Sequence, residues 1–95
     1  MKFMFSGTML RFVDYESEVE ISEPNFELAL SALLTKAPAL QNVLLDGEKN
    51  LRRTHQMFLN GESMEPRYYS DRQARSTLAM QPNDSVYFLT AIAGG

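Results

Sequence analysis

The residues of this chain that could do chemistry lie at its C-terminal end, in the run Ala93-Gly94-Gly95. A chain-terminal carboxyl group is ionised at neutral pH, so the carboxylate of Gly95 could attack a phosphate group. Because glycine has no side chain, Gly94 and Gly95 could enter a channel too narrow for other residues. Six extended residues, 90–95, span roughly 20 Å, which is enough to reach into a partner's active site. Two terminal glycines could also be incidental, since a random chain ends this way about 0.5% of the time.

The composition excludes several other kinds of site. The 95 residues include no cysteine, which rules out disulfides, thiolate metal sites and a catalytic thiol. The net charge of −3 argues against nucleic acid as the main partner. No stretch approaches the roughly 18 apolar residues of a membrane helix, and no secretory signal is visible. These features together favour a cytoplasmic protein that acts away from membranes.

One domain over residues 1–89 is expected to carry a flexible tail, residues 90–95. Alternating polar and apolar side chains predict strands, and Asn60-Gly61 is the strongest signal for a tight hairpin. The last strand should place Val86 and Phe88 on one face and Tyr87 and Leu89 on the other. The predicted strands cover residues 2–10, 18–21, 54–59, 62–64, 77–80 and 85–90.

A single main helix is predicted after the second strand. Asn25 is a good N-cap candidate, and Pro38 should end the helix near Lys36 or Ala37. The side chains expected on its apolar face are Phe26, Leu30, Leu33, Leu34 and Ala37. Residues 40–45 are expected to form a short extra turn.

This order of elements predicts a two-layer α+β domain, with a mixed sheet of four to five strands and the helix packed across one face. A helix between the second and third strands permits the first and last strands to lie side by side in the sheet centre. That is the ubiquitin-like β-grasp arrangement.

The remaining polar residues have plain structural interpretations. Residues 65–76 are expected to form a polar loop. His55 has no second histidine or nucleophile nearby, so it is expected to be a surface or hydrogen-bonded strand residue. Five arginines are predicted to be solvated loop charges: Arg52, Arg53, Arg67, Arg72 and Arg75. The alternative is that they form a binding site for an acidic patch on a partner protein.

These motifs, taken in order, resemble the ThiS/MoaD family of sulfur carrier proteins over almost the whole chain. The segments that carry the resemblance are 5–11 (FSGTMLR), 25–33 (NFELALSAL), 37–40 (APAL), 57–62 (MFLNGE), 81–89 (QPNDSVYFL) and 93–95 (AGG). Two positions depart from the family pattern: Thr90-Ala91 replaces a proline, and Asn83-Asp84 replaces Gly-Asp. Residues 50–62 and the chain length are most similar to carriers serving cysteine or secondary-metabolite pathways.

The resemblance implies a carrier that works only with enzyme partners and is not itself an enzyme. An adenylyltransferase related to ubiquitin-activating enzymes would join Gly95 to AMP from ATP. Sulfide, or a persulfide from a sulfurtransferase, would convert Gly95 into a thiocarboxylate. The thiocarboxylate would donate sulfur to an acceptor in a second enzyme during cysteine, thiamin-type or other biosynthesis. No cofactor or metal bound to the carrier is implied.

The resemblance also implies a docking surface. Leu89 matches a hydrophobic docking position in molybdopterin synthase small subunits, although it could instead pack on the domain's own loop. Ile92, Ala93 and Phe58 are the further candidate contacts.

Three other functions stay open at this point. The chain could be the small, sulfur-carrying subunit of molybdopterin synthase, which would form a stable complex with a large catalytic subunit. It could be a ubiquitin-like protein modifier that forms isopeptide bonds to lysines. It could also be an interaction module in which the glycines have no role.

Overall fold

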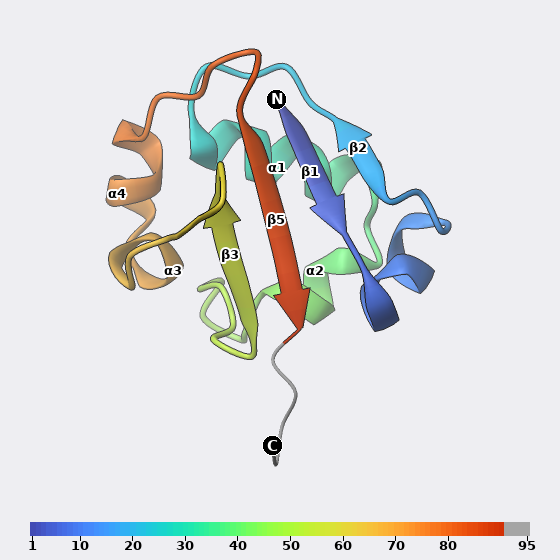
Figure 1. The fold of residues 1–95 in the computed structure, drawn as a ribbon. Helices are drawn as coiled ribbons and strands as arrows, with labels where there is room; N and C mark the ends of the chain where they lie inside the picture. Colours follow the sequence, from blue (N-terminus) through green and yellow to red (C-terminus); the bar gives the residue numbers. More distant parts are fainter. Residues whose placement is uncertain (91–95) are drawn as a thin grey trace.

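Two parallel strands, β1 (Lys2–Phe5) and β5 (Ser85–Thr90), form the centre of a mixed five-stranded sheet (Figure 1). The computed structural model describes residues 1–90 of the chain. The sheet order is β2-β1-β5-β3-β4, and every other pairing is antiparallel. The other strands are β3 (His55–Leu59), beside β5, and the two edge strands β2 (Glu18–Glu20) and β4 (Glu62–Ser63). The predicted β-grasp arrangement is therefore confirmed.

Helix α1 (Phe26–Lys36) crosses one face of this sheet, as predicted (Figure 1). The side chain of Asn25 caps it, because its Oδ1 accepts a hydrogen bond of 2.9 Å from the backbone N–H of Leu28. A shorter helix, α2 (Leu40–Leu44), follows where a short turn was expected. Within residues 1–90, no helix combines the length and apolar character needed to span a bilayer.

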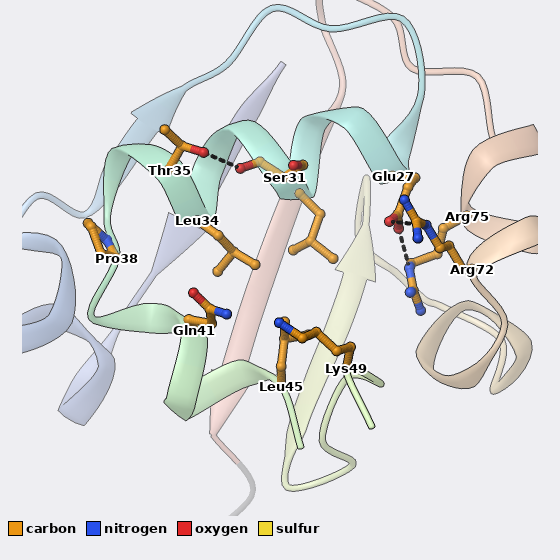
Figure 2. Close-up of a pocket in the computed structure, with 11 residues that line it drawn as sticks. Glu27, Ser31, Leu34, Thr35, Pro38, Gln41, Leu45, Lys49, Arg72 and Arg75 are labelled. Atoms are coloured by element: carbon orange, nitrogen blue, oxygen red, sulfur yellow. Dashed lines mark hydrogen bonds and ion pairs between the residues drawn. The ribbon is translucent and has the colours of Figure 1, made fainter. Parts of the chain in front are cut away.

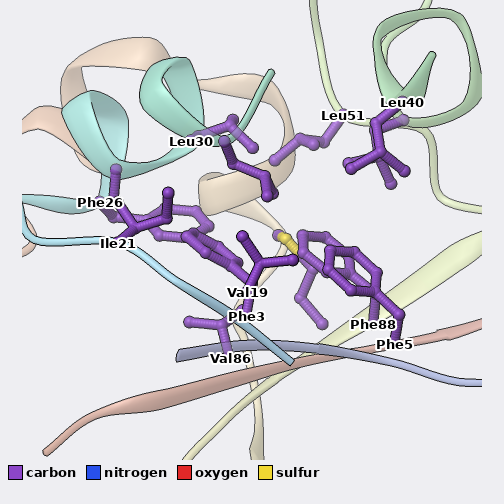
Figure 3. Packing of buried hydrophobic residues seen from close by; sticks show 14 of the residues in the cluster. Phe3, Phe5, Val19, Ile21, Phe26, Leu30, Leu40, Leu51, Val86 and Phe88 are labelled. Atoms are coloured by element: carbon purple, nitrogen blue, oxygen red, sulfur yellow. The ribbon is translucent and has the colours of Figure 1, made fainter. Parts of the chain in front are cut away.

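The core lies between α1 and the two central strands (Figure 3). The parallel register pairs Phe3 with Val86 and Phe5 with Phe88, so all four side chains point to the helix-covered face. The rings of Phe5 and Phe88 stack with centroids 5.5 Å apart, and Phe26 from α1 lies 6.4 Å from Phe3. Each of these side chains is at most 2% exposed, which makes β5 the centre of the folded domain.

The first predicted strand, residues 2–10, is wrong beyond Phe5. Residues Gly7–Val13 form a 3-10 helix, η1, instead. Gly7 turns the chain out of the sheet with a φ of 62°, a conformation that residues with a side chain rarely adopt. Met9 and Val13 of η1 are buried while Arg11 between them is exposed, whereas the period of two of a strand would place all three on one face.

The predicted polar loop over residues 65–76 is also wrong. It contains two short helices, α3 (Arg67–Ser70) and α4 (Arg72–Thr77), on the β3 side of the sheet (Figure 1). Asp71 begins α4, since its Oδ1 accepts a 2.9 Å hydrogen bond from the N–H of Gln73. The strand predicted over 77–80 reduces to a single bridge between Ala79 and Asn25.

Arg75 overturns part of the prediction that the arginines are solvated. Its side chain is 3% exposed, and its Nε lies 2.7 Å from Oε1 of Glu27 in α1. Its Nη1 also donates to the carbonyl oxygens of Tyr68 and Tyr69, at 3.2 and 3.1 Å. Because a buried guanidinium must be paired, Arg75 ties α3 and α4 to α1.

Candidate functional site

The face of the sheet that α1 leaves uncovered carries an apolar patch. Tyr87 and Leu89 point to this face from β5, as the strand alternation predicted. The register sets Tyr87 between Met4 of β1 and Phe58 of β3, so the three side chains form a row across the central strands. Together with Leu89 they line a shallow depression of about 380 Å³, which also contacts Gly61 and Ser85.

Leu89 is the most exposed apolar side chain of this patch. Its side chain is 39% exposed, which is unusual for a large apolar residue of a central strand. Phe58 is half-buried next to it. The structure therefore brings the two predicted docking residues of the sheet into one surface, and Leu89 is not covered by another part of residues 1–90. An exposed apolar surface on a central strand is typical of a protein interaction site.

A hydrogen bond and a tight turn hold the patch in shape. The hydroxyl of Tyr87 lies 2.5 Å from Oγ of Ser6, which anchors the ring at the end of β1. The Asn60-Gly61 turn has positive φ at both residues, 50° and 85°, as the predicted two-residue hairpin requires. These features fix the shape of the patch within the domain itself.

Asn60 connects this turn to the start of β5. Its Oδ1 accepts from the N–H of Ser85 and its Nδ2 donates to Oδ1 of Asp84, both at 2.9 Å. The hydrogen bond from Asn60, and a second from the backbone of Gln81, hold the pKa of Asp84 below its usual range. The turn therefore keeps β3 and β5 in the register that aligns Phe58 with Tyr87.

Sequence reasoning missed Met4 and Tyr87 as members of the patch. The alternation in each strand did place both on faces opposite the core residues, so the signal was present. What the pattern could not supply was the parallel register of β1 with β5, which brings Met4 beside Tyr87.

The predicted tail residues Ile92, Ala93, Gly94 and Gly95 lie outside the described residues, so their roles stay predictions. The patch nevertheless occupies the strand that leads into them, since Leu89 precedes the tail by one residue.

His55 is the one histidine of the sequence. Residues 1–90 contain no group of three metal-binding side chains. His55 lies in β3, as predicted for a strand residue; it is partly buried, and its Nδ1 has no hydrogen-bond partner within the described part of the chain. Burial lowers the pKa of His55, and the charge of Arg52 adds to this effect, while the Val43 backbone opposes it. Within residues 1–90, Nδ1 of His55 therefore has no partner with which it could form a catalytic pair.

Comparison with known proteins identifies the fold. No family model matches the chain, and no curated protein matches it. Solved structures do match over nearly the full length. SAMP1 from Haloferax volcanii has a TM-score of 0.74 at 18% identity, covering 100% of this chain and 98% of its own. A chain of the BexX/CysO complex of Amycolatopsis orientalis gives 0.75 at 17% identity, with 99% and 98% covered.

CysO from Mycobacterium tuberculosis matches equally well, with a TM-score of 0.73 at 18% identity and 96% and 98% coverage. The chain has the β-grasp fold of the ubiquitin-like ThiS/MoaD proteins. The predicted resemblance is thus confirmed for the fold. Because one fold serves many functions, what this β-grasp domain does must be argued from its own residues.

Proposed function

We propose that this β-grasp protein is a sulfur carrier that acts through the carboxylate of Gly95 and docks its enzyme partners on the apolar sheet patch. The observation that carries the proposal is the exposed patch of Met4, Phe58, Tyr87 and Leu89 on the strand that runs into the Gly-Gly tail. A partner seated on the patch would hold the domain body while the tail extends into its active site. The full-length likeness to CysO and SAMP1 supports this reading.

The chemistry would use no side chain of the carrier. In a chain that ends at Gly95, a carboxylate oxygen attacks the α-phosphorus of ATP bound to an adenylyltransferase, and pyrophosphate leaves. Sulfide then attacks the Gly95 carbonyl carbon, the bond to AMP breaks, and Gly95 carries a thiocarboxylate. A second enzyme transfers the sulfur to its acceptor. The absence of cysteine from the sequence fits a carrier whose sulfur is held on the chain end.

Intact-protein mass spectrometry tests the proposal directly. The purified chain is incubated with an adenylyltransferase from its host, ATP and sulfide. We expect a mass gain equal to replacement of one oxygen by sulfur, localised to the peptide that ends in Gly95. Omission of ATP, or addition of one alanine after Gly95, should abolish the gain because the reacting carboxylate is then unactivated or displaced. No gain with an adenylyltransferase that is active on other carriers would contradict the proposal.

A second candidate function is protein modification. Its support is the match to SAMP1 of Haloferax volcanii, a small archaeal modifier protein, over 100% of this chain. In that case Gly95 would form an isopeptide bond to lysines of other proteins. Conjugates that survive boiling and reducing agent, and that depend on Gly95, would favour modification over sulfur transfer.

A further inference from the structure

A groove on the helix-covered side of the molecule shares no residue with the sheet patch (Figure 2). It has a volume of about 490 Å³ and lies between α1, α2 and α4, with the loop that follows α2. Leu30 and Leu34 of α1 and Leu45 after α2 supply its apolar surface. The proposed chemistry of Gly95 makes no use of this side of the domain.

Arg72 and Arg75 place positive charge at one end of this groove. Both arginines pair with Glu27, whose Oε2 lies 3.1 Å from Nε of Arg72 and whose Oε1 lies 2.7 Å from Nε of Arg75. Arg75 is buried and has a structural role, whereas the Arg72 side chain is 82% exposed. Glu27 contacts the Nε of Arg72, so the two terminal nitrogens of the Arg72 guanidinium are available to a carboxylate from another molecule.

Lys49 adds a second exposed cation to the groove. Its loop is a tight turn built around Asp46, whose Oδ1 accepts from the N–H groups of Glu48 and Asn50 at 2.8 and 3.0 Å. This turn holds Lys49 at a φ of 65°, and Figure 2 shows its side chain extending beside Leu45. No carboxylate within residues 1–90 forms an ion pair with the Lys49 ammonium group.

The charge of the groove is opposite to that of the chain. Three cationic side chains and one carboxylate line it, whereas the whole chain has a net charge of −3. An acidic ligand would therefore be attracted to this location and repelled by most of the remaining surface.

The dimensions of the groove fit a short segment of protein. Glu27 to Thr35 on α1 form one wall and span about 12 Å at the helical rise, equal to about four residues of extended chain. The wall alternates charged, hydroxyl and aliphatic side chains, while Leu34 and Leu45 offer a surface for one aliphatic side chain.

We propose that this α1–α2–α4 groove binds an extended acidic segment of a partner protein. A Glu or Asp of the segment would contact Arg72 and Lys49, and an adjacent aliphatic side chain would lie against Leu34 and Leu45. This second docking surface is independent of the sheet patch, so one partner could stay bound here while the tail engages another. It does not depend on the proposed role of Gly95.

Titration of the ¹⁵N-labelled full chain with defined peptides tests this proposal. The probe is an acetylated and amidated peptide of alternating Glu and Leu, and its twin has Gln in place of Glu. We expect saturable amide shifts within residues 27–49 and 72–75, and none at Met4, Phe58 or Leu89. The Gln twin should bind at least about tenfold more weakly, because it lacks the carboxylates.

Charge-neutralising variants sharpen the test. Lys49→Gln with Arg72→Gln should weaken the acidic peptide at least about tenfold. The matched pair Lys36→Gln with Arg52→Gln removes the same two charges from exposed positions outside the groove and should change affinity less than about twofold. Thermal unfolding of all variants verifies that they fold.

Several outcomes would overturn the proposal. They are equal binding of the Gln twin, shifts that map to the sheet patch, or no saturable shift at millimolar peptide. Concentration-dependent shifts of the same residues without peptide would assign the groove to a second copy of this chain. Equally tight binding of acetylglutamate would assign it to a small carboxylate. None of these results bears on thiocarboxylate formation, so failure here is distinct from failure of the carrier proposal.

Discussion

The two faces of β5 carry apolar side chains of similar size in very different surroundings. Val86 and Phe88 are fully buried beneath α1, whereas the side chain of Leu89, on the opposite face, is 39% exposed. One strand therefore supplies both the centre of the core and the most exposed apolar residue of the sheet patch. Apolar character alone therefore does not distinguish residues that stabilise this fold from residues available to a partner. The two kinds of residue differ in whether α1 covers the face of the sheet on which they lie.

Phe88→Ala should have the largest effect, because it removes a ring stacked on Phe5 and Phe3 in the covered layer. We expect the free energy of unfolding to fall by about 3–5 kcal/mol, the range for aromatic truncation in a core. Chemical denaturation monitored by circular dichroism measures it. A loss below about 1 kcal/mol would contradict the assignment of Phe88 to the core.

Glu27→Gln tests how the covering layer is held in place. Without the carboxylate, the buried Arg75 guanidinium loses its counter-charge, and α4 is less firmly attached to α1. We expect the free energy of unfolding to fall by about 3 kcal/mol, since breaking a buried pair leaves one charge uncompensated. The control Glu65→Gln breaks only the exposed pair with Arg67 and should cost less than about 1 kcal/mol. Equal losses in the two variants would show that Arg75 does not need Glu27.

This ion pair also marks the limit of what the sequence could predict. The central strands, α1 and its Asn25 cap followed from alternation, helical spacing and capping chemistry, all of which act between near neighbours in sequence. Glu27 and Arg75 are 48 residues apart, and nothing in their local sequence indicates that they meet. The two short helices around Arg75 were missed because their composition is polar and each buries few side chains.

The candidate site also combines residues that local sequence patterns could predict with residues that only long-range structure brings together. Leu89 and Phe58 could be selected from strand alternation together with the family resemblance. Met4 and Tyr87 joined them only through the register of β1 and β5, which is a long-range property of the sheet. The groove beside Glu27 could not be predicted, because it requires three helices to be placed in space.

Leu89→Asp tests the proposed role of the sheet face that α1 leaves uncovered. A charged side chain there should lower the free energy of unfolding by no more than about 1 kcal/mol, because the position is partly exposed and the cost is mainly the poor strand preference of Asp. It should weaken binding to the activating adenylyltransferase at least about tenfold, since a carboxylate would be buried against an apolar partner surface. Isothermal calorimetry measures the affinity.

Leu28→Asp is the matched control for this variant. Leu28 is also an exposed leucine, at 47%, but it lies on α1, away from the open sheet face. It should leave adenylyltransferase affinity unchanged. Equal weakening by the two substitutions would remove the sheet patch from the docking surface.

Substitution of His55 should change the free energy of unfolding least. His55 lies where β3 pairs with the end of β5, opposite Thr90. Burial lowers the pKa of His55 below 6.5, its ordinary value. Between the folded and unfolded pKa values the unfolded chain binds more protons, so stability is complete above about pH 6.5 and declines as the pH falls below it. His55→Gln should remove that part of the decline, seen as a shallower dependence of unfolding free energy between about pH 7.5 and about pH 5.5. Asp84 does not interfere, because its lowered pKa places its own contribution at more acidic pH. Parallel pH profiles for the two proteins would show that His55 is not held neutral by its surroundings at this end of the sheet.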